Sequence, residues 1–415
     1  MTNTSRTPRF VLNLLGFGTA ISLLGDATLY TVLPHPDISA QLGITLSMVG
    51  LLLGANRAVR LLLNGPIGIL YDRLPRRGLL VSALSLGAGS SIFYAVGSGF
   101  WPLFLGRVLW GLAWSLLWVG GNSVVLDISS AENRGKNSGV YQMWFIIGVA
   151  ASSFLGAVLT DKFGFRSGQW ISVAAIAATA LIWFFFLPET RRKKDQLKGT
   201  QRKSPNQEEI RLPWKLLGLT SVTIFITRFL AWGVIAATAI LWLSDIFGEG
   251  ARIAAYFVPI ATLTGLYTAL SSLTGILSTP LAGSISDRIG RRWPVLGSAA
   301  ILGGLGLWLM SGEIQIIALL GAFLVPVAGS TTETLIPAIA GDRVPENMRS
   351  RALGLINTAG DLGATIGPFA ALGLIQADWL SISGVYRIGG ELLLMIALLA
   401  FSPLVSNRKH NLNQV

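Results

Sequence analysis

Ionisable side chains inside long apolar segments are the residues of this sequence most able to do chemistry. They are Asp26, Arg57, Arg60, Arg107, Arg228, Glu333 and Asp361. A charge in a lipid bilayer is costly, so such residues usually face a cavity or an opposite charge. A carboxylate that is neutral when desolvated and ionised beside an arginine can bind and release a proton. These residues therefore indicate proton exchange or the binding of a charged solute.

Asp26 and Arg107 are the first predicted pair. Asp26 lies eight residues before Pro34, and Arg107 lies five residues after Pro102. At the helical rise of 1.5 Å per residue, both lie roughly 8 to 12 Å below the same membrane boundary. Their side chains can therefore meet and couple transport to protons, or they form a static structural ion pair.

A polar stripe on another segment is a candidate substrate contact. Asn56, Arg57 and Arg60 share a helix face, because residues three or four apart are neighbours. Two arginines there favour an anion, although Asp361 could instead neutralise Arg57 or Arg60. Arg228, also near the middle of its segment, could serve the same carboxylate or a substrate anion.

The remaining candidates lie on three other segments. Asp361 and Glu333 are predicted to take part in proton coupling, and Asn357, one turn from Asp361, to contact substrate. Glu333 has the alternatives of binding a cation or pairing with a loop arginine. Trp110 and Trp114 either line a cavity for flat lipophilic compounds or pack and anchor their helix.

Membrane-spanning helices are the elements that must position these side chains. Of 415 residues, 52% are hydrophobic and 13% charged. At about 20 apolar residues per crossing, the chain has room for roughly a dozen helices and no large soluble domain. The apolar segments lie at about 10–33, 45–71, 78–97, 102–126, 137–160, 170–187, 214–243, 256–285, 294–311, 314–340, 352–375 and 388–405. The predicted fold is therefore an all-α membrane protein with twelve transmembrane helices.

The polar stretch between the sixth and seventh segments predicts the domain organisation. We expect a six-helix bundle over 1–187, a basic linker over 188–213, a second six-helix bundle over 214–405 and a tail over 406–415. Most Lys and Arg residues fall in the tails, the linker and the loops on one side, which predicts that both termini are cytoplasmic. The net charge of +12 is then a match for anionic inner-leaflet lipid rather than for nucleic acid.

Two loops repeat at a fixed offset of 215 residues, which indicates two halves of the same orientation, related by a pseudo-two-fold axis. The first copy contains Gly68, Asp72, Arg73, Arg76 and Arg77, with Asp127 as its acidic partner. The second copy contains Gly283, Asp287, Arg288, Arg291 and Arg292, with Asp342 as its acidic partner. We expect tight glycine loops that place Asp72 near the N-terminus of a neighbouring helix. Asp127 is expected to pair with Arg73 or Arg76, and Asp342 with Arg288 or Arg291, as a latch that opens in one access state.

These loops resemble those of the major facilitator superfamily, whose motif reads G-x-x-x-D-R-x-G-R-R. The second copy matches fully, and the first has Pro75 in place of the second glycine. The resemblance covers the whole chain and implies a monomeric secondary transporter that works by alternating access in a plasma or inner membrane. The sequence from Arg107 to Gly111 looks like a helix 4 motif associated with proton coupling in drug antiporters. Their G-x-x-x-G-P motif belongs on helix 5, whereas here it lies on helix 11.

Several kinds of chemistry lack their motif in this sequence. It has no Cys, no P-loop and no H-E-x-x-H, and its two histidines, His35 and His410, lie in a loop and a tail. We therefore expect no enzyme, no cofactor and no metal, with a proton gradient as the energy source.

The predicted function is transport of a small organic molecule, with protons and membrane lipids as the other partners. The first hypothesis is proton-coupled export of drug-like or metabolite compounds. Uptake of an organic anion held by Arg57, Arg60 and Arg228 is the alternative, and a non-transporting sensor or scaffold is a remote one. Charge reversal of these arginines separates the first two readings, because only an anion porter should lose substrate binding.

Overall fold

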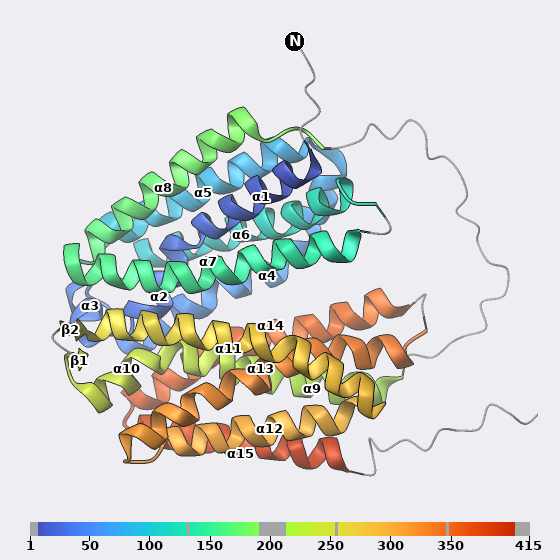
Figure 1. Cartoon of the computed structure of the whole chain (residues 1–415). Helices are drawn as coiled ribbons and strands as arrows, with labels where there is room; N and C mark the ends of the chain where they lie inside the picture. The colour runs from blue at the N-terminus through green and yellow to red at the C-terminus, as the bar shows by residue number, and fades with distance from the viewer. Residues whose placement is uncertain (1–6, 131–132, 191–212, 254–255, 346–347, 403–415) are drawn as a thin grey trace, which may run out of the picture. The chain divides into compact units, whose positions relative to one another are not determined.

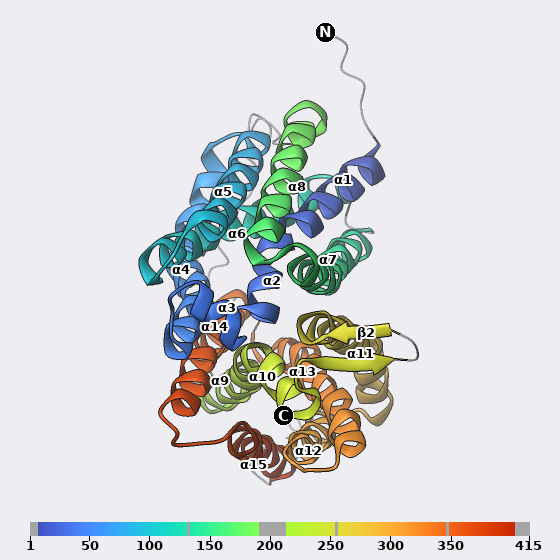
Figure 2. The ribbon, with the colours of Figure 1, turned by 90° about the vertical axis from the view of Figure 1, so that its left-hand side faces the viewer.

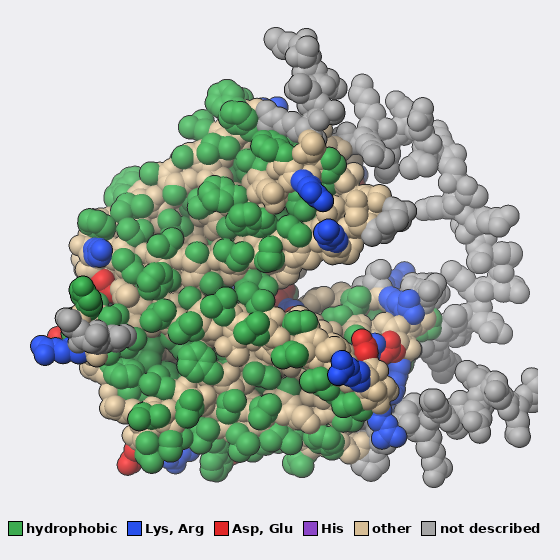
Figure 3. Space-filling view, viewed as in Figure 1, with side chains coloured by type: hydrophobic (Ala, Val, Ile, Leu, Met, Phe, Trp, Pro, Cys, Tyr) green, Lys and Arg blue, Asp and Glu red, His purple; other side chains and the backbone are tan. Residues whose placement is uncertain are grey.

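The computed structural model describes residues 7–130, 133–190, 213–253, 256–345 and 348–402. Most of the predicted linker and the whole predicted tail therefore lie outside the described residues. Within those residues, twelve helices are long and apolar enough to cross a membrane, which confirms the predicted number. Figure 3 shows hydrophobic side chains covering much of the visible helix surface, while Lys and Arg side chains gather near helix ends.

The first half of the chain forms six of these spans. Its helices are α1 (Pro8–Ser22), α2 (Leu24–Val32), α3 (Pro36–Gln41), α4 (Leu46–Arg73), α5 (Arg76–Val96), α6 (Phe100–Asp127), α7 (Arg134–Phe163) and α8 (Phe165–Phe186). The first span, Pro8–Val32, comprises α1 and α2, which meet at Leu23. This junction places Asp26 in the first turn of α2, where the helix dipole favours a carboxylate.

The second half forms the other six spans and a hairpin. Its elements are α9 (Trp214–Arg228), the π-helix η1 (Phe229–Ile235), α10 (Ala236–Phe247), β1 (Gly250–Ile253), β2 (Tyr256–Pro259), α11 (Ile260–Ile289), α12 (Arg292–Met310), α13 (Gln315–Arg343), α14 (Arg349–Gln376) and α15 (Ile382–Phe401). The antiparallel hairpin was not predicted, and its strands pair Gly250 with Pro259 and Ile253 with Tyr256. Gly248 ends the preceding helix with a φ of 62°, a left-handed conformation that glycine adopts without strain.

The described chain forms two compact units. Unit 1 comprises Met1–Ile210 and Ala239–Ala269, and unit 2 comprises Arg211–Thr238 and Leu270–Val415. In unit 1, α5 packs on α6 and α8, α4 packs on α6, and α7 packs on α1 and α2 (Figures 1 and 2). In unit 2, α12 packs on α13 and α15, and α14 packs on α9 and η1.

Small residues let these helices approach closely. Gly306 of α12 and Gly321 of α13 face each other, since a Cβ on either would lie within 2.7 Å of the other's carbonyl oxygen. Lipid tails are as apolar as leucine, so close packing rather than removal of apolar surface from water holds membrane helices together. The glycine contacts therefore contribute directly to the fold that positions the polar side chains.

Candidate functional site

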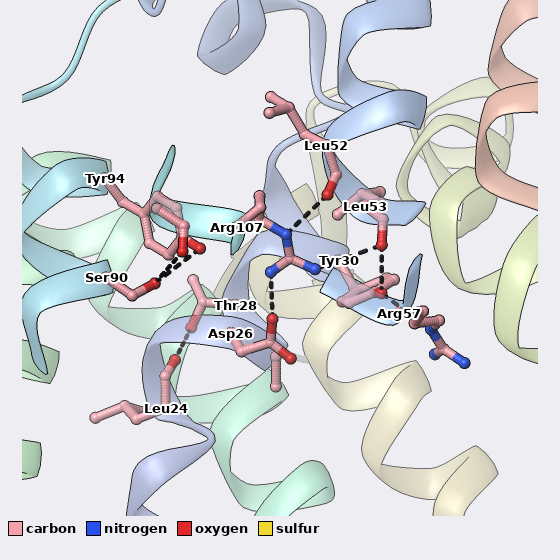
Figure 4. A network of polar contacts seen from close by, with 12 residues as sticks. Leu24, Asp26, Thr28, Tyr30, Leu52, Leu53, Arg57, Ser90, Tyr94 and Arg107 are labelled. Atoms are coloured by element: carbon pink, nitrogen blue, oxygen red, sulfur yellow. Dashed lines mark hydrogen bonds and ion pairs between the residues drawn. The ribbon is translucent and has the colours of Figure 1, made fainter. Parts of the chain in front are cut away.

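Asp26 and Arg107 form a buried ion pair in unit 1 (Figure 4). Arg107 Nη1 donates to the Asp26 carboxylate, and the two side chains are only 1% (Arg107) and 12% (Asp26) exposed. Arg107 Nε also donates to the backbone carbonyl of Leu52 at 2.8 Å, and Nη2 to that of Leu53 at 3.4 Å. One carboxylate and two carbonyl dipoles therefore satisfy a guanidinium that cannot lose its proton.

A glycine on α6 makes this arrangement possible. Gly111 lies one turn after Arg107, and a Cβ there would lie 2.8 Å from the carbonyl oxygen of Asn56. The missing side chain lets α6 approach α4 closely, which brings the α4 carbonyls within reach of Arg107. The Arg-x-x-x-Gly spacing noted in the sequence thus has a local structural reason.

Tyr30 connects this pair to the polar stripe on α4, which consists of Asn56, Arg57 and Arg60. Its hydroxyl donates to the carbonyl of Leu53 at 2.8 Å and accepts from Arg57 Nε at 3.3 Å. The guanidinium carbons of Arg107 and Arg57 lie 5.6 and 5.8 Å from the centre of its ring, within cation–π distance. Sequence reasoning missed Tyr30, whose only signal is its position one turn after Asp26.

The other members of the stripe differ in their burial. Arg57 and Arg60 are half-buried, whereas Asn56 is buried. Among the described residues, Asn56 Oδ1 has no hydrogen-bond partner. The ion pair that the structure gives Asp361 is with Arg228, inside unit 2.

A second cluster, half-buried, lies in unit 2 around Arg228. Its Nε and Nη2 groups donate to both oxygens of Glu333 at 2.6 and 2.8 Å. Nη1 donates to Asp361 at 2.9 Å, and Nη2 also donates to Asn357 Oδ1 at 3.1 Å. The partner of Glu333 is Arg228, an arginine inside a helix, rather than the loop arginine of one of the alternatives. One guanidinium thus holds residues from α13 and α14 together.

Three glycines of α14 allow this cluster to form. A Cβ on Gly360 would lie 2.7 Å from the Arg228 side chain, and one on Gly363 would overlap the carbonyl of Phe225. Gly367 faces Gly233 of the π-helix in the same way. The G-x-x-x-G-P sequence on this helix therefore packs against α9 and η1, and it sets the distance from Asp361 to Arg228.

The tryptophan stripe packs in the interior of unit 1. Trp110 and Trp114 are 2% and 4% exposed and belong to its hydrophobic core. Ring centroids follow one another at 5.9 Å from Trp110 to Trp114 and at 5.7 Å from Trp114 to Trp118. Trp110 and Trp114 therefore pack in the core of unit 1, as in the packing alternative. Spacing four places the rings on one helix face but does not reveal what that face contacts.

The first repeated loop is held by acidic side chains. Arg76 Nε lies 2.6 Å from Asp127 Oδ2, and Thr190 Oγ1 donates to the same oxygen at 3.1 Å. The carboxylate at the N-terminus of α5 is Glu189, which accepts from the backbone N–H groups of Arg76 and Arg77 at 3.1 Å. Asp72 itself lies in the last turn of α4, which continues to Arg73.

Glu189 and Thr190 were not predicted as members of this loop. Their only sequence signal is a pair of hydrogen-bonding side chains directly after Pro188, where the last helix of the half ends. Gly68 was predicted to form the tight loop, but it lies inside α4, as Gly283 lies inside α11. The turn itself needs only the residues between Arg73 and Arg76.

The second repeated loop pairs differently from the prediction. Asp342 accepts from Arg292 Nε at 2.5 Å, not from Arg288 or Arg291, and Arg292 also lies 3.2 Å from Asp287. Gly290 has a φ of 67°, and Arg291 is extended, so α12 begins one residue later than the repeat predicts. The first helical arginine is therefore Arg292 in this copy, whereas it is Arg76 in the first. The two copies differ at this point, where the first has Pro75 and the second has Gly290, and this difference accounts for the one-residue shift in the helix start.

Within the described residues, no group of three His, Cys, Asp or Glu side chains is placed to hold a metal ion.

Comparisons with known proteins agree with this architecture. The model of the Major Facilitator Superfamily matches residues 15–269 and 224–414. The chain is 23% identical to the inner membrane transport protein YajR of Escherichia coli over 90% of this chain and 82% of that protein. It is 26% identical to the quinolone resistance protein NorA of Staphylococcus aureus over 52% of this chain and 54% of that one.

A solved structure shows the same fold. A bacterial homologue of the human lysosomal transporter Spinster, in an inward-facing and occupied conformation, superposes with a TM-score of 0.74 at 15% identity, over 96% of this chain and 95% of that one. Together with the twelve apolar helices and the repeated loops, the family match shows that this chain belongs to the Major Facilitator Superfamily of integral, multi-pass membrane transporters and is not an enzyme.

Proposed function

We propose that this protein exports a small organic compound in exchange for protons. The observation that carries the proposal is the buried Asp26–Arg107 ion pair. Arg107 is charged at every accessible pH, so the carboxylate is the member of the pair that can exchange a proton. A carboxylate with one strong partner can change its charge when that partner or the surrounding water changes.

The proposed cycle needs one proton at Asp26. When the site opens to the outside, Asp26 takes a proton from water, and its hold on Arg107 weakens. When the site opens to the inside, the proton returns to water and the ion pair re-forms. Substrate moves outward in the complementary half of the cycle, so that the proton gradient drives export. Alternating access of two six-helix bundles, residues 1–187 and 214–405, supplies the two openings.

The relatives support this direction and location. The name of NorA describes quinolone resistance, and that of YajR an inner membrane transport protein. We extend these properties to the present chain as a bacterial-type exporter in the inner membrane, with both termini cytoplasmic and a monomer as the working unit. The excess of basic residues in the predicted cytoplasmic loops supports this orientation.

The repeated loops are proposed to latch one access state. Arg76 with Asp127 in the first loop and Arg292 with Asp342 in the second connect consecutive cytoplasmic helix ends. The Arg292–Asp342 pair is the more exposed of the two, at 26% and 53%, and an exposed ion pair contributes only about 0 to 1 kcal/mol, which suits a contact that must break in every cycle. If Arg76→Ala leaves the ratio of inward-open to outward-open molecules unchanged, the latch proposal is wrong.

The anion-uptake alternative has less support at Arg228 than at its other two arginines. Arg228 is engaged by two carboxylates and one amide oxygen, so it offers no net positive charge to an anion. Arg57 and Arg60 remain as the residues to test. Charge reversal by Arg57→Glu should abolish transport of an anion and spare part of the transport of a neutral or cationic compound.

The test uses purified protein reconstituted into liposomes with an imposed pH gradient. Norfloxacin, a quinolone, and tetraphenylphosphonium are the probes, chosen first by thermal stabilisation in detergent. A ligand at 100 times its dissociation constant should add about 2.7 kcal/mol to the free energy of unfolding. Asp26→Asn should abolish transport driven by the gradient, and Asp37→Asn, an exposed carboxylate in the same unit, should not. Gradient-driven transport that survives in Asp26→Asn would refute the proposed coupling.

A further inference from the structure

The Arg228 cluster carries one more carboxylate than it has basic groups. Among the residues that the structure describes, Arg228 is the basic partner of both Glu333 and Asp361. The three side chains are 15%, 35% and 19% exposed, and each lies well inside a helix that can span the membrane. With both carboxylates ionised, the cluster has one uncompensated negative charge.

Such a charge is costly at this position. A buried ion pair is tolerated when its hydrogen bonds are complete, whereas an unmatched charge inside a membrane span must be neutralised. A proton is the smallest group that can do this. The cluster therefore has a place for one proton even while its ion pairs are formed, whereas Asp26 takes a proton only when its pair with Arg107 loosens.

The geometry distinguishes the two carboxylates. Both oxygens of Glu333 accept from Arg228, at 2.6 and 2.8 Å, which is the strong bidentate arrangement of arginine with a carboxylate. Asp361 accepts from Arg228 through Oδ1 alone, at 2.9 Å. Within the described residues, Asp361 Oδ2 has no hydrogen-bond donor, and the Asp361 side chain is the more buried of the two. Its negative charge is therefore the less compensated one.

Among the described residues, Arg228 is the charged group in ion-pair contact with Asp361. From α9 it faces Arg228, and from α13 it faces Glu333. The π-helix η1, which also packs on α14, consists of the apolar sequence Phe-Leu-Ala-Trp-Gly-Val-Ile. On α14 itself the polar neighbour is Asn357, which accepts from Arg228.

We infer that Asp361 is a second proton-binding site, with the proton on Oδ2, and that Glu333 stays ionised as the fixed partner of Arg228. The protonated cluster is neutral. Release of this proton to water restores the charge of Asp361 and strengthens its contact with Arg228. The role of this site in transport rests on the proposed function and makes the cycle a two-proton one, with Asp26 and Asp361 carrying one proton each.

Infrared spectroscopy of the purified full-length protein tests the inference directly. A protonated carboxyl shielded from water gives a C=O stretching band above the amide bands, and this band shifts in D2O. The measurement uses Asp26→Asn, so that the carboxyl of unit 1 does not contribute. Aspartate labelled with 13C at its side-chain carboxyl lowers the frequency of an Asp band and leaves a Glu band in place. Asp378→Asn, a loop carboxylate with a positive φ that Asn also adopts, is the matched control.

We expect one such band in Asp26→Asn, shifted by labelled aspartate, retained in Asp26→Asn/Asp378→Asn and lost in Asp26→Asn/Asp361→Asn. Arg228→Gln in the Asp26→Asn background should add a second band, because both carboxylates then lack their counter-charge. A band that labelled glutamate shifts would move the proton to Glu333 and overturn the assignment. Absence of any band in Asp26→Asn protein that is monodisperse would overturn the second site itself.

Failure of the proposed function has a different signature. Gradient-driven transport that persists in Asp26→Asn contradicts the coupling role of unit 1 but leaves the infrared result for unit 2 intact. Conversely, loss of transport in Asp26→Asn without a labelled-aspartate band contradicts only the second site.

Discussion

Both units contain an arginine with acidic partners, but the two arginines are compensated differently. Arg107 in unit 1 meets one carboxylate and two backbone carbonyls and is 1% exposed. Arg228 in unit 2 meets two carboxylates and an amide oxygen and is 15% exposed. The first site is neutral when its one carboxylate is ionised, whereas the second has an extra negative charge when both of its carboxylates are ionised.

This difference determines what each site can tolerate. A guanidinium cannot be neutralised by losing its proton, so Arg107 depends on the ionised form of Asp26 while their site is closed. Carboxylates can become neutral by binding protons, so unit 2 can adjust to the loss of one partner. The same types of residue therefore form a rigid site in one unit and an adaptable one in the other.

Removal of Asp26 should have the largest effect on stability. Asp26→Leu leaves Arg107 buried without a counter-charge, which should lower the free energy of unfolding by about 3–5 kcal/mol. The loss should be the same from neutral pH down to about pH 5, where a free aspartate is still ionised. Denaturation in mixed micelles, followed by tryptophan fluorescence, measures it. A deficit that disappears on acidification would contradict the picture of a rigid site in unit 1.

Removal of Arg228 should cost less and should respond to pH. Arg228→Leu leaves Glu333 and Asp361 without a counter-charge, and at neutral pH we expect a loss of about 3 kcal/mol. Because both carboxylates bind protons as the pH falls, the loss should shrink under acidic conditions. The same denaturation experiment across a pH series tests the contrast with Asp26→Leu. Parallel pH profiles for the two variants would remove the distinction between the units.

The close approach of α14 should be the next most sensitive feature. Gly363→Leu places a side chain against the backbone of Phe225 and should cost about 1–3 kcal/mol through overpacking. It should also release Asp361 from Arg228 and change the infrared band described above. Gly373→Leu on the same helix meets no atom within 4 Å of its Cβ and serves as the control. Equal effects of the two substitutions would show that glycine spacing does not set the cluster geometry.

Asp361→Asn should have the smallest effect. It removes the extra negative charge and weakens one hydrogen bond, so the change in the free energy of unfolding should stay below about 1.5 kcal/mol. Thermal unfolding in detergent gives the comparison with Asp26→Asn, which should be clearly less stable. A severe loss in Asp361→Asn would mean that the charge of Asp361 is needed to hold the cluster together.

The helix count and the repeat could be predicted from the sequence because both follow from local pattern. Twelve apolar segments of membrane-spanning length need no tertiary information, and the loop repeat is visible at a constant offset. Helix ends were less certain. The last span begins at Ile382, not near residue 388, because Ser381 caps its first turn by accepting from the N–H of Gly384.

The sequence by itself determined which residues can carry charge inside the membrane: Asp26, Arg107, Arg228, Glu333 and Asp361 stand out in apolar segments because an unpaired charge there is expensive. Only the tertiary structure decided their partners. Arg228 joins α9, α13 and α14, and the Trp110 stripe packs the core. These pairings depend on how each helix is rotated and how closely glycines let it approach its neighbours. The shift from Arg291 to Arg292 shows the same point, since one glycine in a left-handed conformation moves the start of a helix.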